Sequence, residues 1–211
     1  MKKKYQHPFW LGLLILAIAL SFIACQPKPA SKQEQLPNII LIMADDLGYE
    51  TITANGGSSY HTPRIDALAE QGMRFEHCYS QPLCTPSRVQ IMTGIYNIRN
   101  YVKFGVLDPG QYTFGHMLQQ AGYQTCIIGK WQLGKDMKAP KKAGFDRHCL
   151  WQVTEGATDD FKRATRYSRP ELQIDGKIKT FELSDYGPDI VSQFGIDFIQ
   201  TTHQTNRPFF L

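Results

Sequence analysis

The chain has 211 residues, 20% of them charged, and a formal net charge of +4. The first 24 residues contain Lys2, Lys3 and Lys4 and no acid, so residues 25–211 carry 20 Lys and Arg against 19 Asp and Glu. This near-neutral balance argues against nucleic acid as the partner.

The N-terminus has the features of an export signal. Its lysines precede an uncharged apolar run from Phe9 to Ala24, an arrangement typical of a signal peptide. The run of about 16 residues is short for a membrane-spanning helix, which needs ~20. Its end, Phe22 to Cys25, resembles a bacterial lipoprotein processing site. We therefore expect an exported bacterial protein, a lipoprotein of the periplasm or outer membrane.

This resemblance implies that residues 1–24 are a lipoprotein signal peptide and that Cys25 becomes the lipidated N-terminus, which holds the protein to a membrane. An uncleaved anchor and a simple secretory signal are the alternatives, and all three export the protein. Residues 25–36 are polar and are predicted to form a tether. Residues 37–211 are predicted to form the folded domain.

The first predicted strand, Asn38 to Ala44, is a continuous apolar run of the kind found in strands that are buried on both faces. It ends at Asp45 and Asp46. Ligands of open α/β sheets gather at the carboxyl ends of strands, and two carboxylates there suit Ca²⁺ or Mg²⁺. The alternative is that Asp45 caps the following turn and that Asp46 is solvated.

A helix and a second strand are predicted next. Thr62 and Pro63 open an amphipathic helix that Gly72 ends. The segment from Met73 to Tyr79 alternates between apolar and polar residues and is predicted to be a strand. His77 within this segment is expected to be structural.

The segment that follows places a cysteine beside a helix N-terminus. Pro86 favours a first helical turn, so we predict a helix from about Pro86 to Thr93 with Thr85 as its N-cap. Cys84 would lie just before this N-terminus, where the helix dipole favours an anion. Arg88, one turn further, offers a forked donor for tetrahedral oxyanions. The alternative for an isolated cysteine is a small buried residue.

Helices and strands continue to alternate toward the C-terminus. The predicted elements are a helix at Thr113 to Gln120, strands at Tyr123 to Gly129 and within Phe145 to Val153, a turn at Asp175-Gly176, a helix within Ser184 to His203, and a strand from Pro208. Lys130, at a strand's carboxyl end, suits an oxyanion or is a solvated charge. Arg163, Arg166 and Arg169 form a basic stretch that faces either an anionic glycan or solvent.

Two segments resemble the signatures of the sulfatase family. Cys84-Thr85-Pro86-Ser87-Arg88, with Ile91-Met92 and Thr93-Gly94, is similar to the first, and Gly122 to Thr125 with Ile128 to Trp131 is similar to the second. In that family a maturation enzyme oxidises the cysteine to formylglycine, whose hydrated aldehyde is the nucleophile. The resemblance implies a sulfuric ester hydrolase with an alkaline phosphatase-like α/β fold, whose central sheet is mainly parallel and flanked by helices.

The resemblance also implies roles for single residues. Asp45, Asp46 and the residue made from Cys84 would ligate Ca²⁺, with Mg²⁺ as the alternative. Arg88 and Lys130 would bind the sulfate oxygens.

Gln132 departs from the family pattern, which commonly has histidine at this position. A glutamine donates and accepts hydrogen bonds but does not titrate near neutral pH. We predict that Gln132 positions the nucleophile and that another group supplies the base.

The resemblance covers residues 37–211 and only the front part of the family's catalytic domain. We therefore expect the sheet, the metal ligands and the C-terminal domain to be incomplete in this chain. The expected substrate is a sulfated small molecule or glycan. The alternatives are a phosphoric ester hydrolase of the same superfamily and a catalytically incompetent lipoprotein that binds sulfated glycan.

Five cysteines are present, and Cys25 and Cys84 have implied roles. One disulfide among Cys78, Cys126 and Cys149 is an alternative. Because Cys126 and Cys149 lie in apolar, strand-like contexts, we predict buried free thiols instead.

Overall fold

The structure is a computed structural model that describes residues 36–151 and 166–211. The elements below belong to one compact unit, Pro37–Leu211. The predicted signal peptide, Cys25 and Arg163 lie outside the described residues.

The described strands form a five-stranded sheet in the order β4-β3-β2-β1-β5. They are β1 (Gln124–Lys130), β2 (Arg147–Trp151), β3 (Glu171–Ile174), β4 (Lys177–Thr180) and β5 (Phe209–Phe210). β1 pairs in parallel with β2 and β5, whereas β2–β3 and β3–β4 are antiparallel. In the β1–β2 register Lys130 lies opposite Trp151, so the carboxyl ends of the two strands meet.

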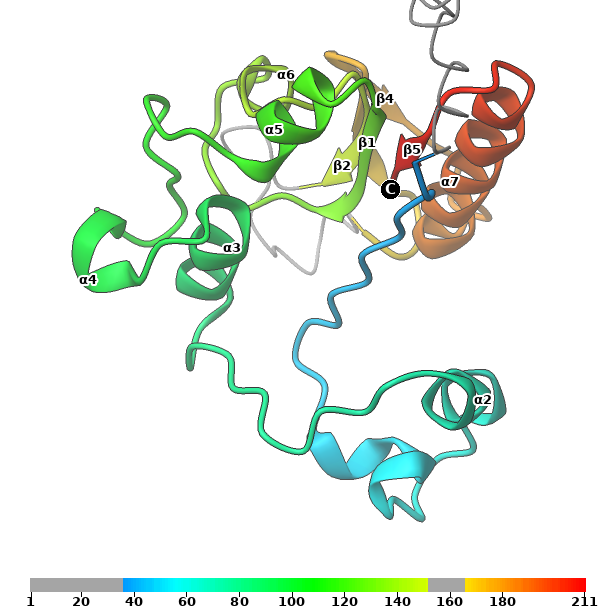
Figure 1. Ribbon diagram of the computed structural model, residues 1–211. Coiled ribbons are helices and arrows are strands. Elements are labelled where there is room, and N and C mark those ends of the chain that lie inside the picture. The colour runs from blue at the N-terminus through cyan, green and yellow to red at the C-terminus, as the bar shows by residue number, and fades with distance from the viewer. Residues whose placement is uncertain (1–35, 152–165) are drawn as a thin grey trace, which may run out of the picture. The chain divides into compact units, whose positions relative to one another are not determined.

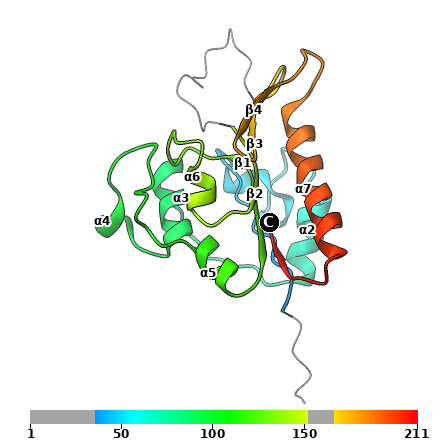
Figure 2. The same ribbon diagram turned by 90° about the horizontal axis from the view of Figure 1, so that it is seen from above.

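Helices lie on both faces of this sheet. α7 (Gly187–His203) packs against β1 and β2 on one face, and α5 (Phe114–Gln120) packs against β1 on the other (Figure 1, Figure 2). α3 (Cys84–Thr93) contacts α5. The other described helical segments are η1 (Tyr49–Thr51), η2 (Thr53–Asn55), α2 (Pro63–Gln71), α4 (Asn97–Asn100) and α6 (Ala139–Lys142).

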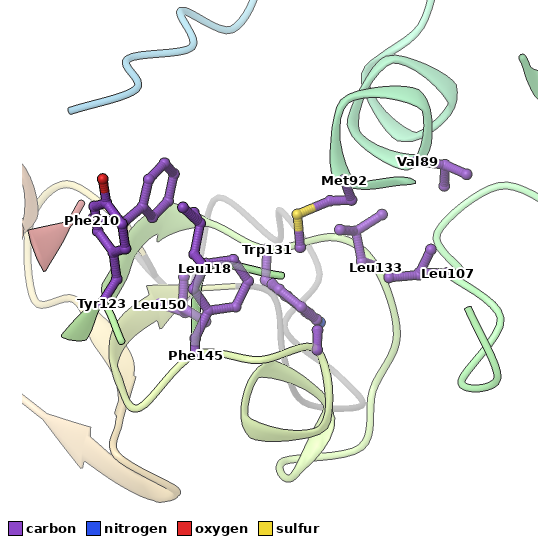
Figure 3. Close-up of a cluster of buried hydrophobic side chains, with 11 residues drawn as sticks. Val89, Met92, Leu107, Leu118, Tyr123, Trp131, Leu133, Phe145, Leu150 and Phe210 are labelled. Atoms are coloured by element: carbon purple, nitrogen blue, oxygen red, sulfur yellow. The ribbon is translucent and has the colours of Figure 1, made fainter. Parts of the chain in front are cut away.

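The larger apolar core extends from the sheet and α5 to α3, which contributes Val89 and Met92 (Figure 3). Trp131, Phe145 and Leu150 are at most 1% exposed within it. The rings of Phe114 and Phe145 meet edge to face, with centroids 5.9 Å apart. Such packing explains why the sequence around β1 and β2 is apolar.

Strand β1 is covered on both of its faces. Ile127 packs against the larger core, whereas Cys126 and Ile128 belong to a second cluster with Phe198 of α7. Successive side chains of a strand point to opposite faces, so a strand between two layers of helices needs apolar residues in succession. The prediction of a buried strand here is confirmed.

Local sequence signals account for several element ends. Thr113 caps α5 through a capping box with His116, and α2 ends at Gly72. The β3–β4 hairpin turns at Asp175 and Gly176, whose φ values of 48° and 86° suit a type I′ turn. These features confirm the predicted helix ends and the predicted turn.

The predicted strand at 38–44 is wrong. The structure has an isolated parallel bridge between Ile39 and Phe210, and the backbone of Ile39 and Leu41 exchanges three hydrogen bonds with residues 209 and 211. Ile40 and Ile42 are 53% and 82% exposed. Because β5 contains two residues, the extended segment finds few backbone partners beyond Ile39, and its apolar side chains stay uncovered.

The predicted strand from Met73 to Tyr79 is also wrong. This segment belongs to no helix or strand, and the side chains of Met73 and Tyr79 are 79% and 85% exposed. An alternating pattern produces a strand only where a neighbouring strand supplies ladder hydrogen bonds.

Within the described residues, no helix has both the length and the apolar character needed to cross a bilayer.

Candidate active site

Helix α3 carries two of the predicted site residues, Cys84 and Arg88. The helix begins at Cys84, so the predictions of a start at Pro86 and of a Thr85 cap are wrong. The hydroxyl of Thr85 is buried and accepts a hydrogen bond from the backbone N–H of Gly105 at 3.0 Å. Pro86 does not set the start because the first N–H groups of a helix have no intrahelical acceptor, and a proline is tolerated anywhere among them.

Gln132 follows β1 and reaches back to the start of α3. The Sγ of Cys84 donates to the Oε1 of Gln132 at 2.8 Å. Gln132 has a φ of 48°, in the left-handed region that few non-glycine residues adopt. Its carbonyl accepts a hydrogen bond from the Thr85 hydroxyl at 3.4 Å. The unusual turn therefore directs the amide onto the sulfur.

Asp45 holds the two predicted oxyanion-binding cations together. Its Oδ1 accepts from Arg88 Nη1 at 3.1 Å, and its Oδ2 accepts from Lys130 Nζ at 2.6 Å. Burial alone would raise the pKa of Asp45, but the hydrogen bonds and charges of Lys130 and Arg88 outweigh it and lower the pKa below 3.8. Arg88 Nη1 also donates to the carbonyl of Cys84 at 3.3 Å. The ionised Asp45 thus holds the two cations together, and Arg88 connects them to the backbone of Cys84.

Asp46 follows Asp45 in the chain but differs from it in exposure. It is exposed, and its φ of 54° lies in the left-handed region. Carboxylates are hard oxygen donors that fit Ca²⁺ or Mg²⁺, and each oxygen of Asp45 keeps a second lone pair. The described residues contain no group of three or more His, Cys, Asp or Glu side chains that could hold a metal ion. Because Ca²⁺ takes 6–8 oxygens, Asp45 and Asp46 fit part of a metal site.

A cavity of about 750 Å³ lies beside these residues. Asp45, Arg88 and Lys130 line its polar part, and apolar residues of β1 and β5 line much of the rest. Trp151 also lines it, and the Nζ of Lys130 lies 5.6 Å from the centre of the Trp151 ring. The cavity therefore joins a charged end to an aromatic wall.

Comparison with known proteins identifies this arrangement. The Sulfatase family model matches residues 37–211. The chain belongs to the sulfatase family. It is 34% identical to the N-acetylglucosamine-6-O-sulfatase of Bacteroides thetaiotaomicron, with 93% of this chain and 33% of that protein covered. It is 31% identical to the N-acetylgalactosamine-6-sulfatase of Mus musculus, with 94% of this chain and 42% of that protein covered.

Solved structures place the sulfatase chain in the same fold. One, of a protein in complex with its substrate D-glucosamine-2-N,6-O-disulfate, is similar with a TM-score of 0.69 and 33% identity over 82% of this chain and 33% of that one. Another, Ps i-CgsB, has a TM-score of 0.71 and 30% identity over 84% of this chain and 44% of that one. The prediction of an alkaline phosphatase-like α/β fold is confirmed. The chain spans about a third to two fifths of the length of these curated relatives.

In the structure of this sulfatase chain, five of the predicted site residues are linked by hydrogen bonds, and Asp46 lies at the surface. The five are Cys84, Arg88, Lys130, Gln132 and Asp45. Sequence reasoning missed Trp151, because only the β1–β2 register brings it to Lys130. The signal was a tryptophan near the end of the strand predicted within Phe145 to Val153.

The described cysteines of the sulfatase chain are free thiols. Cys126 and Cys149 are fully buried, which raises the pKa of Cys126 to about 12 and that of Cys149 to about 11. Cys78 is exposed. The prediction of buried free thiols is confirmed. His77 has Tyr79 as its recorded side-chain partner, at 3.2 Å, in line with a structural role.

Proposed function

We propose that this protein hydrolyses sulfate esters. The observation that carries the proposal is the convergence of Cys84, Gln132 and the pair of cations on Asp45, since three separate segments supply these groups. Fixed positive charges and donors beside a nucleophile stabilise the charge that develops on oxygen during group transfer. The sulfatase names of the relatives support the same reaction.

Residue 84 is the proposed nucleophile position. A maturation enzyme would convert Cys84 to formylglycine, which supplies a hydrated aldehyde as the nucleophile. The Oε1 of Gln132 accepts a hydrogen bond from Sγ in the structure and would accept one from a hydroxyl at the same position. Gln132 thereby orients the attacking group but does not act as a titrating base.

Arg88 and Lys130 are the proposed sulfate-binding residues. Both now donate to Asp45, and both keep further N–H donors for a sulfate oxygen, since a guanidinium has five and an ammonium three. Ca²⁺ or Mg²⁺ held by Asp45 and Asp46 would add positive charge beside the same oxygens.

The proposed substrate class is a sulfated glycan, with a sulfated small molecule as the broader class. Two relatives are named for removing a sulfate from the 6-position of an amino sugar, and a solved relative holds a disulfated glucosamine as its substrate. These names support a sulfated amino sugar as one member of the proposed substrate class.

Turnover of 4-nitrophenyl sulfate and 4-nitrophenyl phosphate tests the proposed reaction. We expect sulfate turnover to exceed phosphate turnover and Cys84→Ala to abolish it without changing the thermal unfolding curve. Retained turnover in Cys84→Ala would refute the assignment of residue 84 as the nucleophile. Faster phosphate turnover would favour a phosphoric ester hydrolase, and retention of sulfated glycan without hydrolysis would favour a catalytically incompetent binder.

Maturation of Cys84 is tested separately by the mass of the tryptic peptide Phe75 to Arg88. Formylglycine has a different mass from cysteine and no thiol, so residue 84 would resist alkylation while Cys78 in the same peptide reacts.

We also propose that the protein is exported and lipidated at Cys25. The basic and apolar N-terminus supports this proposal. Incorporation of labelled palmitate in bacteria, and its loss in Cys25→Ser, would support lipidation. A labelled Cys25→Ser protein would contradict it.

A further inference from the structure

A row of alternating cationic and aromatic side chains leads away from Lys130. Trp151 lies 5.6 Å from Lys130 Nζ, and Arg166 Cζ lies 5.1 Å from the centre of the same ring. Arg166 Cζ also lies 5.1 Å from the ring of Tyr167, which stacks on Tyr186 with centroids 6.2 Å apart and 19° between the planes. We call Trp151, Arg166, Tyr167 and Tyr186 the aromatic strip.

The backbone of the aromatic strip is held by the start of α7. The N–H of Gly187 donates to the carbonyl of Tyr167 at 2.7 Å, and Ser168 forms an antiparallel bridge with Tyr186. A Cβ atom at position 187 would lie 1.9 Å from the carbonyl oxygen of Arg166, so only a glycine permits this approach. The aromatic strip therefore has a defined position on the helix and is not an unsupported loop.

The side chains of the aromatic strip are available to a ligand. Tyr167 and Tyr186 are 54% and 50% exposed, and Trp151 lines the cavity that contains Lys130. Within the described ranges Arg166 forms no ion pair with a carboxylate, so its forked donors can bind an anionic group. Aromatic faces offer apolar contact area, with the phenol groups as polar handles, which suits the C–H faces and hydroxyls of a sugar ring.

We propose that the aromatic strip binds the sugar units next to the one that loses its sulfate, so that the substrate is an oligosaccharide with a second anionic group for Arg166. This inference rests on the proposed sulfatase activity. Trp151 links the two functions, since it contacts both Lys130 of the candidate active site and Arg166 of the aromatic strip. An aryl sulfate engages only the candidate active site.

Chain-length dependence of turnover tests the inference. The probes are 4-nitrophenyl sulfate, glucosamine 6-sulfate and a heparin-derived tetrasaccharide that ends in glucosamine 6-sulfate. We expect kcat/KM for the tetrasaccharide to exceed that for the monosaccharide about tenfold or more. Arg166→Gln should remove this advantage and Tyr167→Ala should reduce it, with turnover of 4-nitrophenyl sulfate unchanged. Arg169→Gln, an exposed arginine of the same segment, is the matched control.

Calorimetric binding of the same saccharides separates the aromatic strip from catalysis. Tighter binding of the tetrasaccharide that is lost in Arg166→Gln supports the inference even without hydrolysis, and the proposed function alone then fails. The inference is overturned if the ratio of kcat/KM for the tetrasaccharide to kcat/KM for the monosaccharide is the same in the wild type and Arg166→Gln. It is also overturned if Arg169→Gln loses the tetrasaccharide preference as Arg166→Gln does. In both cases the proposed sulfatase activity is unaffected. Displacement of the tetrasaccharide by an equal concentration of single-stranded oligonucleotide would also overturn it, because such strips bind nucleic acid too.

Discussion

The Sγ atom of Cys84 and the Oε1 atom of Gln132 lie 2.8 Å apart although 48 positions separate the two residues. We expect Gln132→Ala to lower kcat for a sulfate ester about fivefold, because one hydrogen bond of ~1 kcal/mol to the nucleophile is lost. Little change in KM is expected, since the amide touches the attacking group. Steady-state kinetics with 4-nitrophenyl sulfate provide both values.

Gln132→His completes this comparison. Histidine restores a titrating group beside the nucleophile, so the pH profile of kcat around neutrality should differ between this variant and the wild type. A strong acceleration in Gln132→His, together with no effect of Gln132→Ala, would show that Gln132 has no working role.

Removal of the Asp45 charge should destabilise the fold. Asp45→Asn leaves Arg88 and Lys130, whose side chains are 10% and 11% exposed, without a carboxylate partner. Leaving a buried charge unpaired costs about 3 kcal/mol in the free energy of unfolding. Urea denaturation measures this loss. Asp46→Asn, at an exposed position, is the control and should change it by less than about 0.5 kcal/mol, and equal effects would contradict the ion-pair argument.

His148 should make stability depend on pH. It is 3% exposed, and its Nε2 accepts from the N–H of Gly176 at 3.0 Å. Burial lowers the pKa of His148 below 6.5. The positive charge of Arg147 also lowers this pKa, whereas the negative charge of Asp175 raises it by less than the other two effects lower it. The unfolded chain therefore binds the proton more tightly, so the free energy of unfolding should fall as pH drops below 6.5 and level off below the folded-state pKa.

Urea midpoints between about pH 5 and 8 measure this slope. His148→Gln should flatten it, while His77→Gln, at an exposed position, should leave it unchanged. A slope that persists in His148→Gln would assign the pH dependence to other groups.

Gly187→Ala should disturb α7 and the aromatic strip together. The added methyl group would meet the carbonyl oxygen of Arg166 at 1.9 Å, so backbone must shift, at a cost of about 1–3 kcal/mol. Thermal unfolding should detect the loss, and the tetrasaccharide preference should fall. At Gly110 the nearest contact of an added Cβ is 3.5 Å, so Gly110→Ala is the matched control. Equal stability of the two variants would contradict the close approach.

The described cysteines should differ sharply in alkylation rate. Cys78 is exposed, whereas burial raises the pKa of Cys126 to about 12 and that of Cys149 to about 11. Iodoacetamide at neutral pH should therefore modify Cys78 in the native protein and reach Cys126 and Cys149 only in urea. Peptide mass mapping distinguishes the sites, and native labelling of Cys126 would contradict the buried position.

The fold could be predicted where one segment carries its own signal. Strand β1 has an apolar run, and the helix predicted at Thr113 to Gln120 differs from α5 by one residue, so both were found. The prediction of a strand at 38–44 was wrong because a strand depends on its neighbours, and the structure gives this segment one short partner. Strands β3 and β4 were missed except for their turn, since each has only four residues, too few for an alternating pattern of apolar side chains to stand out.

The candidate site was predictable for a different reason. Cys84, Arg88 and Lys130 stand in family motifs, so spatial proximity was implied without a structure. The role of Asp45 as the shared counter-ion of Arg88 and Lys130 was not predictable, because carboxylates at the end of a predicted strand suit metal ions and cationic side chains equally well. Trp151 belongs to no motif, and only its pairing across from Lys130 places it beside the reaction.

That pairing also sets a distance. The hydrogen bonds of the β1–β2 ladder hold Lys130 and Trp151 side by side at neighbouring strand ends, and a slip of one residue would turn one of them to the opposite face. In the proposed binding mode the sheet therefore fixes the distance between the scissile bond and the neighbouring sugar. Exchange of Arg166 or Tyr167, which lie outside the ladder, would change which glycan is preferred while that spacing stays the same.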